Sequence, residues 1–107
     1  MSYRRSTVRL IIERDGQIHR HGKTTTCTVV DMSEEGVRVK AQSPVTVGEE
    51  LQLDCWLVKD RWIRCTVQVR YVSSPYFGAR ITHISPEQQS HLREYIDDLI
   101  TTNFPTR

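Results

Sequence analysis

The chain has 107 residues, 37% of them hydrophobic and 26% charged, which is the composition of one folded domain with no room for a second hydrophobic core. Its formal net charge of +2 is too small to indicate non-specific DNA binding, and no apolar run approaches the ~18 residues of a membrane-spanning helix. Twelve of the 15 basic residues are arginines, a preference that favours planar, bidentate recognition of anions over diffuse attraction.

The start of the chain and its cysteines indicate a cellular compartment. Residues 1–5 contain no hydrophobic segment of the kind found in a secretion signal, so we expect a cytoplasmic protein that does not insert into a membrane. The three cysteines, Cys27, Cys55 and Cys65, show no Cys-x-x-Cys spacing, and their odd number argues against a disulfide framework. We therefore expect all three thiols to stay reduced and to serve as small core residues.

Positive charge is concentrated near the N-terminus. Arg4, Arg5 and Arg9 fall within six residues, and no acidic residue precedes Glu13. Residues 7–13 alternate between apolar and mostly polar side chains, which predicts a half-buried strand. On an extended chain Arg5 and Arg9 project to the same side, roughly 13 Å apart, and can bracket a ligand of dinucleotide size. A solvated basic N-terminus is the alternative explanation for the same cluster.

Turn residues separate the first strand from the second. Asp15-Gly16 is a turn signal, and His19-Arg20-His21 is expected to lie in a polar loop, as exposed histidines rather than metal ligands. Residues 24–30 are β-branched almost throughout and predict a second strand.

A short acidic turn joins the second strand to the third. Asp31–Gly36 combines Asp and Ser side chains that can cap their own backbone, and we expect Gly36 to supply a positive φ. The turn also places a carboxylate and a hydroxyl beside the first strand, although a well-made turn needs no further function. Residues 37–41 alternate again and predict the third strand.

Residues 51–58 and 63–71 form a predicted hairpin. A three-residue turn at 59–61 keeps both apolar sets on one side and places Cys55 opposite Cys65. The second strand of this hairpin directs five side chains inward: Ile63, Cys65, Val67, Val69 and Tyr71.

Trp56 and Trp62 fall on the outer side of this hairpin or near its tip. Two interpretations are open: exposed rings that stack on a base or contact a partner, or rings covered by the C-terminal helix. A last strand is predicted at residues 77–81.

The chain ends in a predicted helix over residues 86–101. Ser85 has the position of an N-cap, Pro86 is the first helical residue, and Gln88 is placed to complete a capping box. The helix carries one apolar stripe: Leu92, Tyr95, Ile96, Leu99 and Ile100. This stripe either closes one end of a barrel or forms an oligomer interface, and we favour the barrel end.

Together these elements predict a single domain spanning residues 1–107. It consists of a mobile basic arm (1–6), a six-stranded antiparallel β-barrel (7–84) and one C-terminal α-helix (86–101).

Two motifs then narrow the function. Arg5 and Arg9 fit Arg-x-x-x-Arg, preceded by a further Arg4, and Asp31–Gly36 fits Asp-x-Ser-x-x-Gly. Both motifs in this order, on a barrel-like pattern, resemble the PilZ family of bacterial cyclic di-GMP receptor domains. The resemblance covers essentially the whole chain, as for a stand-alone member of the family, and implies a barrel that binds cyclic di-GMP without catalysis.

The resemblance also implies which residues contact the ligand. Arg5 and Arg9 would grip phosphates and guanine edges, with Arg4 as an auxiliary contact. Asp31 and Ser33 would meet a guanine or ribose edge, and Gly36 would allow close approach of the turn. Arg38 and Arg80 are further candidates for the pocket. The doubled arginine implies an intercalated pair of ligand molecules.

The expected function is that of a receptor or adaptor. Ligand binding would order residues 1–6, whose only apolar anchor is Tyr3, and pass the signal to an unidentified protein effector. No cofactor is expected beyond the ligand, and the four histidines show no partnered nucleophile, so we do not expect an enzyme. The alternatives are a protein-interaction module without nucleotide binding and a small barrel for single-stranded nucleic acid, against which the modest net charge argues.

Overall fold

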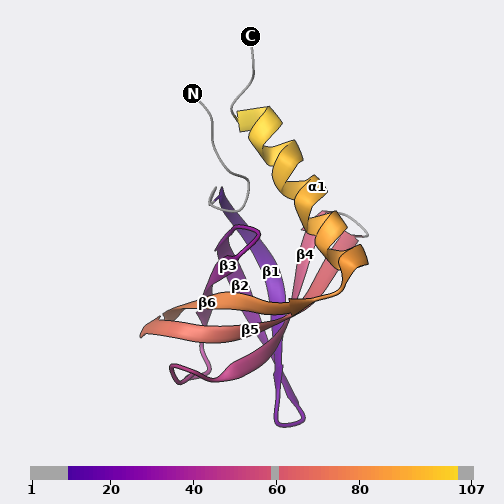
Figure 1. Ribbon diagram of the computed structural model, residues 1–107. Helices are drawn as coiled ribbons and strands as arrows, with labels where there is room; N and C mark the ends of the chain where they lie inside the picture. Colours follow the sequence, from indigo (N-terminus) through magenta and orange to yellow (C-terminus); the bar gives the residue numbers. More distant parts are fainter. Residues whose placement is uncertain (1–9, 59–60, 104–107) are drawn as a thin grey trace.

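The computed structural model describes residues 10–58 and 61–103 (Figure 1). The six strands and one helix follow in chain order: β1 (Leu10–Arg20), β2 (Lys23–Met32), β3 (Gly36–Ala41), β4 (Glu50–Val58), β5 (Arg61–Ser73), β6 (Tyr76–Ile84) and α1 (Pro86–Asn103). All neighbouring strands are antiparallel, and they close a barrel in the order β1-β2-β3-β6-β5-β4. The predicted barrel with a C-terminal helix is therefore confirmed.

The first turn lies six residues later than predicted. Asp15-Gly16 is not a turn, because β1 continues to Arg20 and Gly16 pairs with both neighbouring strands of the barrel. A Cβ on Gly16 would lie 2.7 Å from the carbonyl oxygen of Asp54, so the glycine permits the close approach of β1 and β4. The chain instead reverses at His21 and Gly22, whose φ angles of 49° and 76° suit a two-residue hairpin turn.

The predicted register of the β4–β5 hairpin is wrong by two residues. Cys55 lies opposite Ile63, and Cys65 lies opposite Leu53, with an irregularity in the pairing between Trp56 and Val58. A shift of two residues preserves the direction of every side chain, so the inward faces are correct although the partners are not. Tyr71 is the exception, because it was expected to face inward and is exposed.

The three cysteines are buried inside the barrel as predicted. Cys27, Cys55 and Cys65 are all free thiols. Burial raises the pKa of each thiol to about 12, far above the ordinary value. They therefore act as small apolar residues of the core.

The helix α1 follows β6 and lies at one end of the barrel, close to β4 and β5 (Figure 1). Its apolar stripe belongs to the same buried cluster as the barrel interior, which confirms that the helix packs on its own barrel. Ser85 accepts a hydrogen bond from the Gln88 backbone N–H at 3.2 Å, as the predicted N-cap requires. The Gln88 side chain accepts from the backbone N–H of Arg64 and thereby ties the first turn of α1 to β5. Within the described residues, no helix has the length and apolar character needed to cross a membrane.

Candidate functional site

The turn between β2 and β3 is organised by Ser33. Its hydroxyl accepts hydrogen bonds from the backbone N–H groups of Glu35 at 3.2 Å and Gly36 at 3.1 Å, and the Ser33 backbone N–H donates to the Gly36 carbonyl at 2.9 Å. Ser33 is buried, with 3% of its surface exposed. The Ser33 hydroxyl therefore holds the shape of the turn. The sequence had instead led us to expect direct contact between Ser33 and a ligand.

Asp31 and Gly36 flank this turn on the neighbouring strands. Asp31 is buried, and its Oδ2 lies 2.9 Å from Nε of Arg38, its cross-strand partner on β3. Gly36 begins β3 and pairs with Arg80 of β6. Among the described glycines, Gly22 and Gly48 have positive φ, so the expected positive φ of Gly36 is wrong. Gly36 does, however, line a groove.

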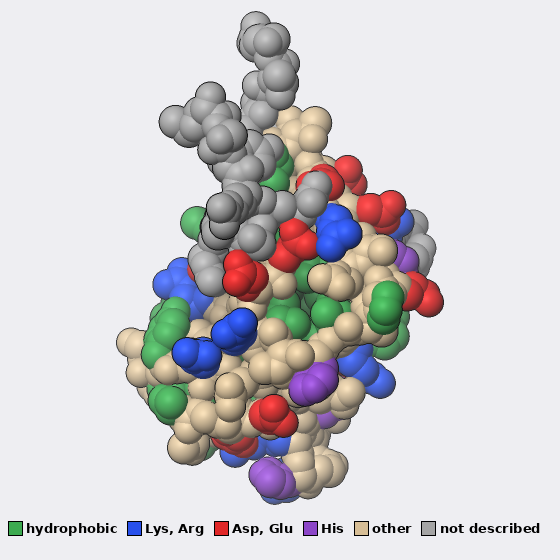
Figure 2. All heavy atoms as spheres, viewed as in Figure 1, with side chains coloured by type: hydrophobic (Ala, Val, Ile, Leu, Met, Phe, Trp, Pro, Cys, Tyr) green, Lys and Arg blue, Asp and Glu red, His purple; other side chains and the backbone are tan. Residues whose placement is uncertain are grey.

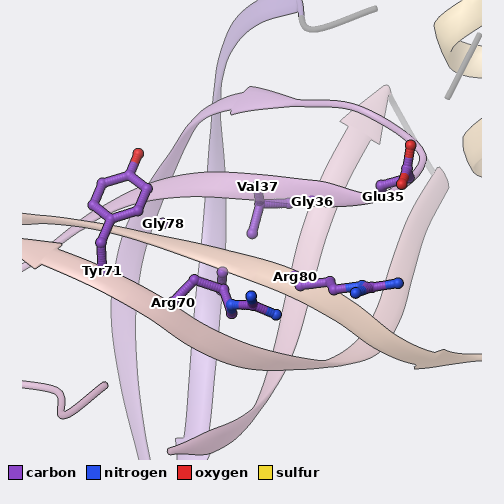
Figure 3. Close-up of a pocket in the computed structure, with 8 residues that line it drawn as sticks. Glu35, Gly36, Val37, Arg70, Tyr71, Gly78 and Arg80 are labelled. Carbon is purple, nitrogen blue, oxygen red and sulfur yellow. The ribbon is translucent and has the colours of Figure 1, made fainter. Parts of the chain in front are cut away.

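The groove lies on the outer surface of β3, β6 and β5 and has a volume of about 400 Å³. Its walls are formed by eight residues: Glu35, Gly36, Val37, Arg70, Tyr71, Gly78, Ala79 and Arg80. Figure 3 shows Tyr71 at one end of the groove and Glu35 at the other, with the side chains of Arg70 and Arg80 between them. Such a volume is within the range of small-molecule sites.

Tyr71 forms the aromatic wall of the groove. Its ring lies over Gly78 of β6, where an added Cβ would be 2.0 Å from Cε1 of the ring. Tyr71 is 51% exposed, so one side of the ring contacts the glycine backbone while much of its surface faces solvent. The ring therefore rests against β6 on one side and remains accessible to an aromatic ligand on the other.

Arg70 and Tyr71 are the groove residues that the sequence pattern missed. Strict alternation assigned Tyr71 to the barrel interior, but the β5–β6 pairing shifts between Val69 and Tyr71. This bulge leaves Arg70 and Tyr71 both exposed, with Tyr71 over Gly78 on the outer face of β6. A glycine inside a strand often marks a bulge or a close backbone approach, so Gly78 was the available signal.

A second aromatic side chain extends this face. Arg38 Cζ and Lys40 Nζ lie 5.7 and 5.9 Å from the ring centroid of Tyr76. Figure 2 shows Lys and Arg gathered beside hydrophobic side chains at the ends of β5 and β6, whereas several Asp and Glu side chains follow α1. The face that carries the groove is thus aromatic and cationic.

The structure brings together part of the predicted site. Gly36 and Arg80 line the groove, and Asp31, Ser33 and Arg38 lie on the adjoining turn and strand. Arg4, Arg5 and Arg9 lie outside the described residues.

The tryptophans of the β4–β5 hairpin lie apart from the groove. Trp56 and Trp62 are cross-strand partners whose rings stack with centroids 6.2 Å apart, and each is 39% exposed. Arg64 Cζ lies 5.3 Å from the Trp62 ring centroid. One interpretation of the sequence expected both rings to be covered by α1, but neither ring is buried. The two ring faces partly cover each other.

A buried carboxylate lies near these tryptophans, on the outer side of β4. Asp54 accepts hydrogen bonds from Arg64 Nε and Nη2 at 2.7 and 3.0 Å, and its Oδ2 lies 2.7 Å from His19 Nε2. Burial on its own would raise the pKa of Asp54, but the hydrogen bonds from Arg64 and His19 outweigh burial and hold that pKa below its ordinary value. His19 thus belongs to β1 and a structural network, not to the loop expected from the sequence. The described residues contain no group of three His, Cys, Asp or Glu side chains placed to hold a metal ion.

Comparison with known proteins identifies the family. The model of the PilZ domain matches residues 3–98, which is most of the chain. The chain belongs to the PilZ family. A search of curated proteins returned no match.

Solved structures agree with this PilZ fold. The inhibitor of motility MotI (DgrA) of Bacillus subtilis has a TM-score of 0.81 at 22% identity, covering 98% of this chain and 55% of its own. YcgR of Escherichia coli, solved in complex with c-di-GMP, has a TM-score of 0.75 at 15% identity, covering 90% and 46%. MrkH of K. pneumonia has a TM-score of 0.75 at 18% identity, covering 95% and 52%. The chain therefore spans about half the length of each of these proteins.

Proposed function

We propose that this PilZ domain is a receptor for cyclic di-GMP and not an enzyme. The observation that carries the proposal is the Asp-x-Ser-x-x-Gly turn, held by Ser33, next to a groove lined by Arg70, Arg80 and Tyr71. The family of the chain and the c-di-GMP complex of the structurally similar YcgR support the same ligand.

The chemistry of the ligand matches that of the residues. Cyclic di-GMP carries two phosphodiester charges, which require fixed cations, and guanine O6 and N7 form the acceptor pair that an arginine fork fits. Arg5 and Arg9 grip phosphates and guanine edges, and Arg4 adds an auxiliary contact. Asp31 lies at the edge of the same turn and accepts hydrogen bonds from a guanine, while Gly36 lets the backbone approach the ligand.

The response to the ligand is an ordering of the basic arm. Residues 1–6 bind the nucleotide through their arginines, and the ordered arm then presents a new surface to a protein effector. Two intercalated ligand molecules bind each chain, as resemblance to family members with a doubled arginine at this point implies. Each chain thereby converts the concentration of a small anion into a change of protein surface.

Titration calorimetry with cyclic di-GMP tests the receptor function. Wild-type protein is compared with Arg5→Ala/Arg9→Ala and with Lys23→Ala, which removes an exposed cation from the distant β1–β2 hairpin. Each lost charge-assisted contact weakens binding by roughly 1.5–3 kcal/mol, so the double variant binds at least a hundredfold more weakly while the Lys23 variant is unchanged. No heat from folded wild-type protein contradicts the proposal and favours the protein-interaction module.

The same titration and a protease experiment test the stoichiometry and the arm. We expect two ligand molecules per chain, and a value of one contradicts the intercalated pair without affecting the receptor function. Trypsin cleaves after Arg4, Arg5 and Arg9 in free protein, and saturating ligand should slow these cleavages at least tenfold. Equal rates with and without ligand would exclude the ordering of the arm.

A further inference from the structure

The described arginines divide into six with a partner and two without. The six with a partner contact a carboxylate or a carbonyl: Arg14 with Trp56, Arg20 with Glu49, Arg38 with Asp31, Arg61 with Glu94, Arg64 with Asp54, and Arg93 with Glu34. Arg70 and Arg80 have no such contact among the described residues. Both of these line the same groove.

Arg70 and Arg80 come from neighbouring strands and extend along the groove in the same direction (Figure 3). Arg80 pairs with Gly36 on one side and with Gln68 on the other, so neither cross-strand partner is acidic. Like charges on adjacent strands repel each other, whereas five of the other described arginines are paired with a carboxylate. An anion between the two guanidinium groups would relieve the repulsion.

The surroundings of the two arginines determine the class of anion. Tyr71 supplies an aromatic wall that lies over Gly78, and the strand backbone forms a floor without large side chains. A groove of about 400 Å³ with two cations and one aromatic face suits a phosphate attached to a flat ring better than a bare inorganic ion. Glu35, at the end opposite Tyr71, disfavours a second negative group there.

We propose that Arg70 and Arg80 form a second anion grip, on the barrel wall, for the phosphate of a nucleotide whose base lies against Tyr71. The identity of that nucleotide as cyclic di-GMP rests on the proposed function, whereas the grip itself does not. The ligand is then held from two sides, by the arginines of the N-terminal arm and by those of β5 and β6. Affinity consequently depends on the wall as well as on the arm.

Calorimetry with cyclic di-GMP tests the contribution of the wall. Arg70→Gln and Arg80→Gln should each weaken binding at least tenfold, and the double variant at least a hundredfold, with Lys23→Gln as the matched loss of an exposed charge far from the groove. All three positions are solvent-exposed, and unchanged thermal midpoints verify folding. Wild-type affinity in the double variant overturns the proposal and leaves the receptor function intact.

Nuclear magnetic resonance of the arginine side chains separates the grip from the nucleotide. Pyrophosphate titrated into full-length protein should shift the Nε–Hε resonances of Arg70 and Arg80, assigned through the two variants, and leave that of Arg20 unchanged. If cyclic di-GMP does not bind but pyrophosphate produces these shifts, the grip stands and the proposed function fails. If pyrophosphate leaves both resonances unchanged, the grip is excluded.

Discussion

Two glycines of the barrel have different tolerance for a single added carbon. At Gly16 the new Cβ would lie 2.7 Å from a backbone oxygen of Asp54, which belongs to the closing strand pair and cannot move aside. At Gly78 it would meet the ring of Tyr71, which is half exposed and able to rotate away. We expect Gly16→Ala to lower the free energy of unfolding by about 1–3 kcal/mol, and Gly78→Ala to change it by less than about 0.5 kcal/mol.

Urea unfolding of both glycine variants measures this contrast. Gly78→Ala should nevertheless weaken nucleotide binding, because the displaced Tyr71 no longer forms the wall of the groove. Equal destabilisation by the two substitutions would mean that Tyr71 is fixed as rigidly as the backbone.

Asp54 makes stability depend on acid. Its pKa is lowered in the folded protein, so its contribution is complete above its unfolded pKa of about 4 and is lost as the pH falls through the lower folded value. Asp54→Asn removes charge-assisted hydrogen bonds worth about 1.5–3 kcal/mol near neutral pH. The wild-type and variant stabilities should therefore converge below about pH 4. Urea midpoints measured across this range test it, and a constant difference at every pH would contradict the assignment.

At the scale of elements, the turn between β2 and β3 depends on one hydroxyl. Ser33→Ala leaves the N–H groups of Glu35 and Gly36 without their acceptor in a buried turn, which should lower the free energy of unfolding by about 1–3 kcal/mol. Ser33→Thr keeps the hydroxyl and serves as the control. If chemical denaturation finds Ser33→Ala as stable as wild type, the hydroxyl is not the organising group and its direct contact with ligand becomes the better explanation.

Elements were predictable from sequence where strict periodicity held. The apolar stripe of α1, the Ser85 cap and the faces of β4 follow from spacing alone. Irregularities could not be placed, because a glycine such as Gly78 signals a bulge or a close approach without showing which side chains change direction. The bulge near Tyr71 hid the contribution of β5 to the groove. Asp15-Gly16 resembled a turn because a glycine that permits close strand packing cannot be distinguished, from sequence alone, from a glycine in a turn.

For the whole molecule, the fold and the family were accessible from the sequence, while the strands that line the groove were not. The motif Asp31–Gly36 marks the turn, and it says nothing about which strands lie next to it. Closure of the barrel places β6 between β3 and β5, so Arg70 and Arg80 meet Gly36 from more than thirty positions away in the chain. Such contacts depend on topology and escape local pattern analysis.

Closure also makes the barrel a single cooperative unit, and the reaction rates of its buried thiols measure how often the barrel opens. Cys27, Cys55 and Cys65 lie on three strands and are 8%, 0% and 3% exposed, and each has a pKa of about 12. A disulfide reagent at about pH 8 should therefore react only when the barrel opens and the thiols regain their ordinary pKa. We expect three variants that each retain one cysteine to react at one common rate after correction for their stabilities.

Wild-type protein unfolded in denaturant should contain three thiols that react with the reagent, and a count of one reactive thiol would reveal a disulfide. Saturating cyclic di-GMP should slow the common rate, because a ligand that binds only the folded state reduces the open population by the factor 1 + [L]/Kd.

A faster reaction of Cys27 alone, the most exposed of the three, would show instead that β1 and β2 separate locally while β4 and β5 stay closed. The barrel would then open first at the strand that follows the N-terminal arginines.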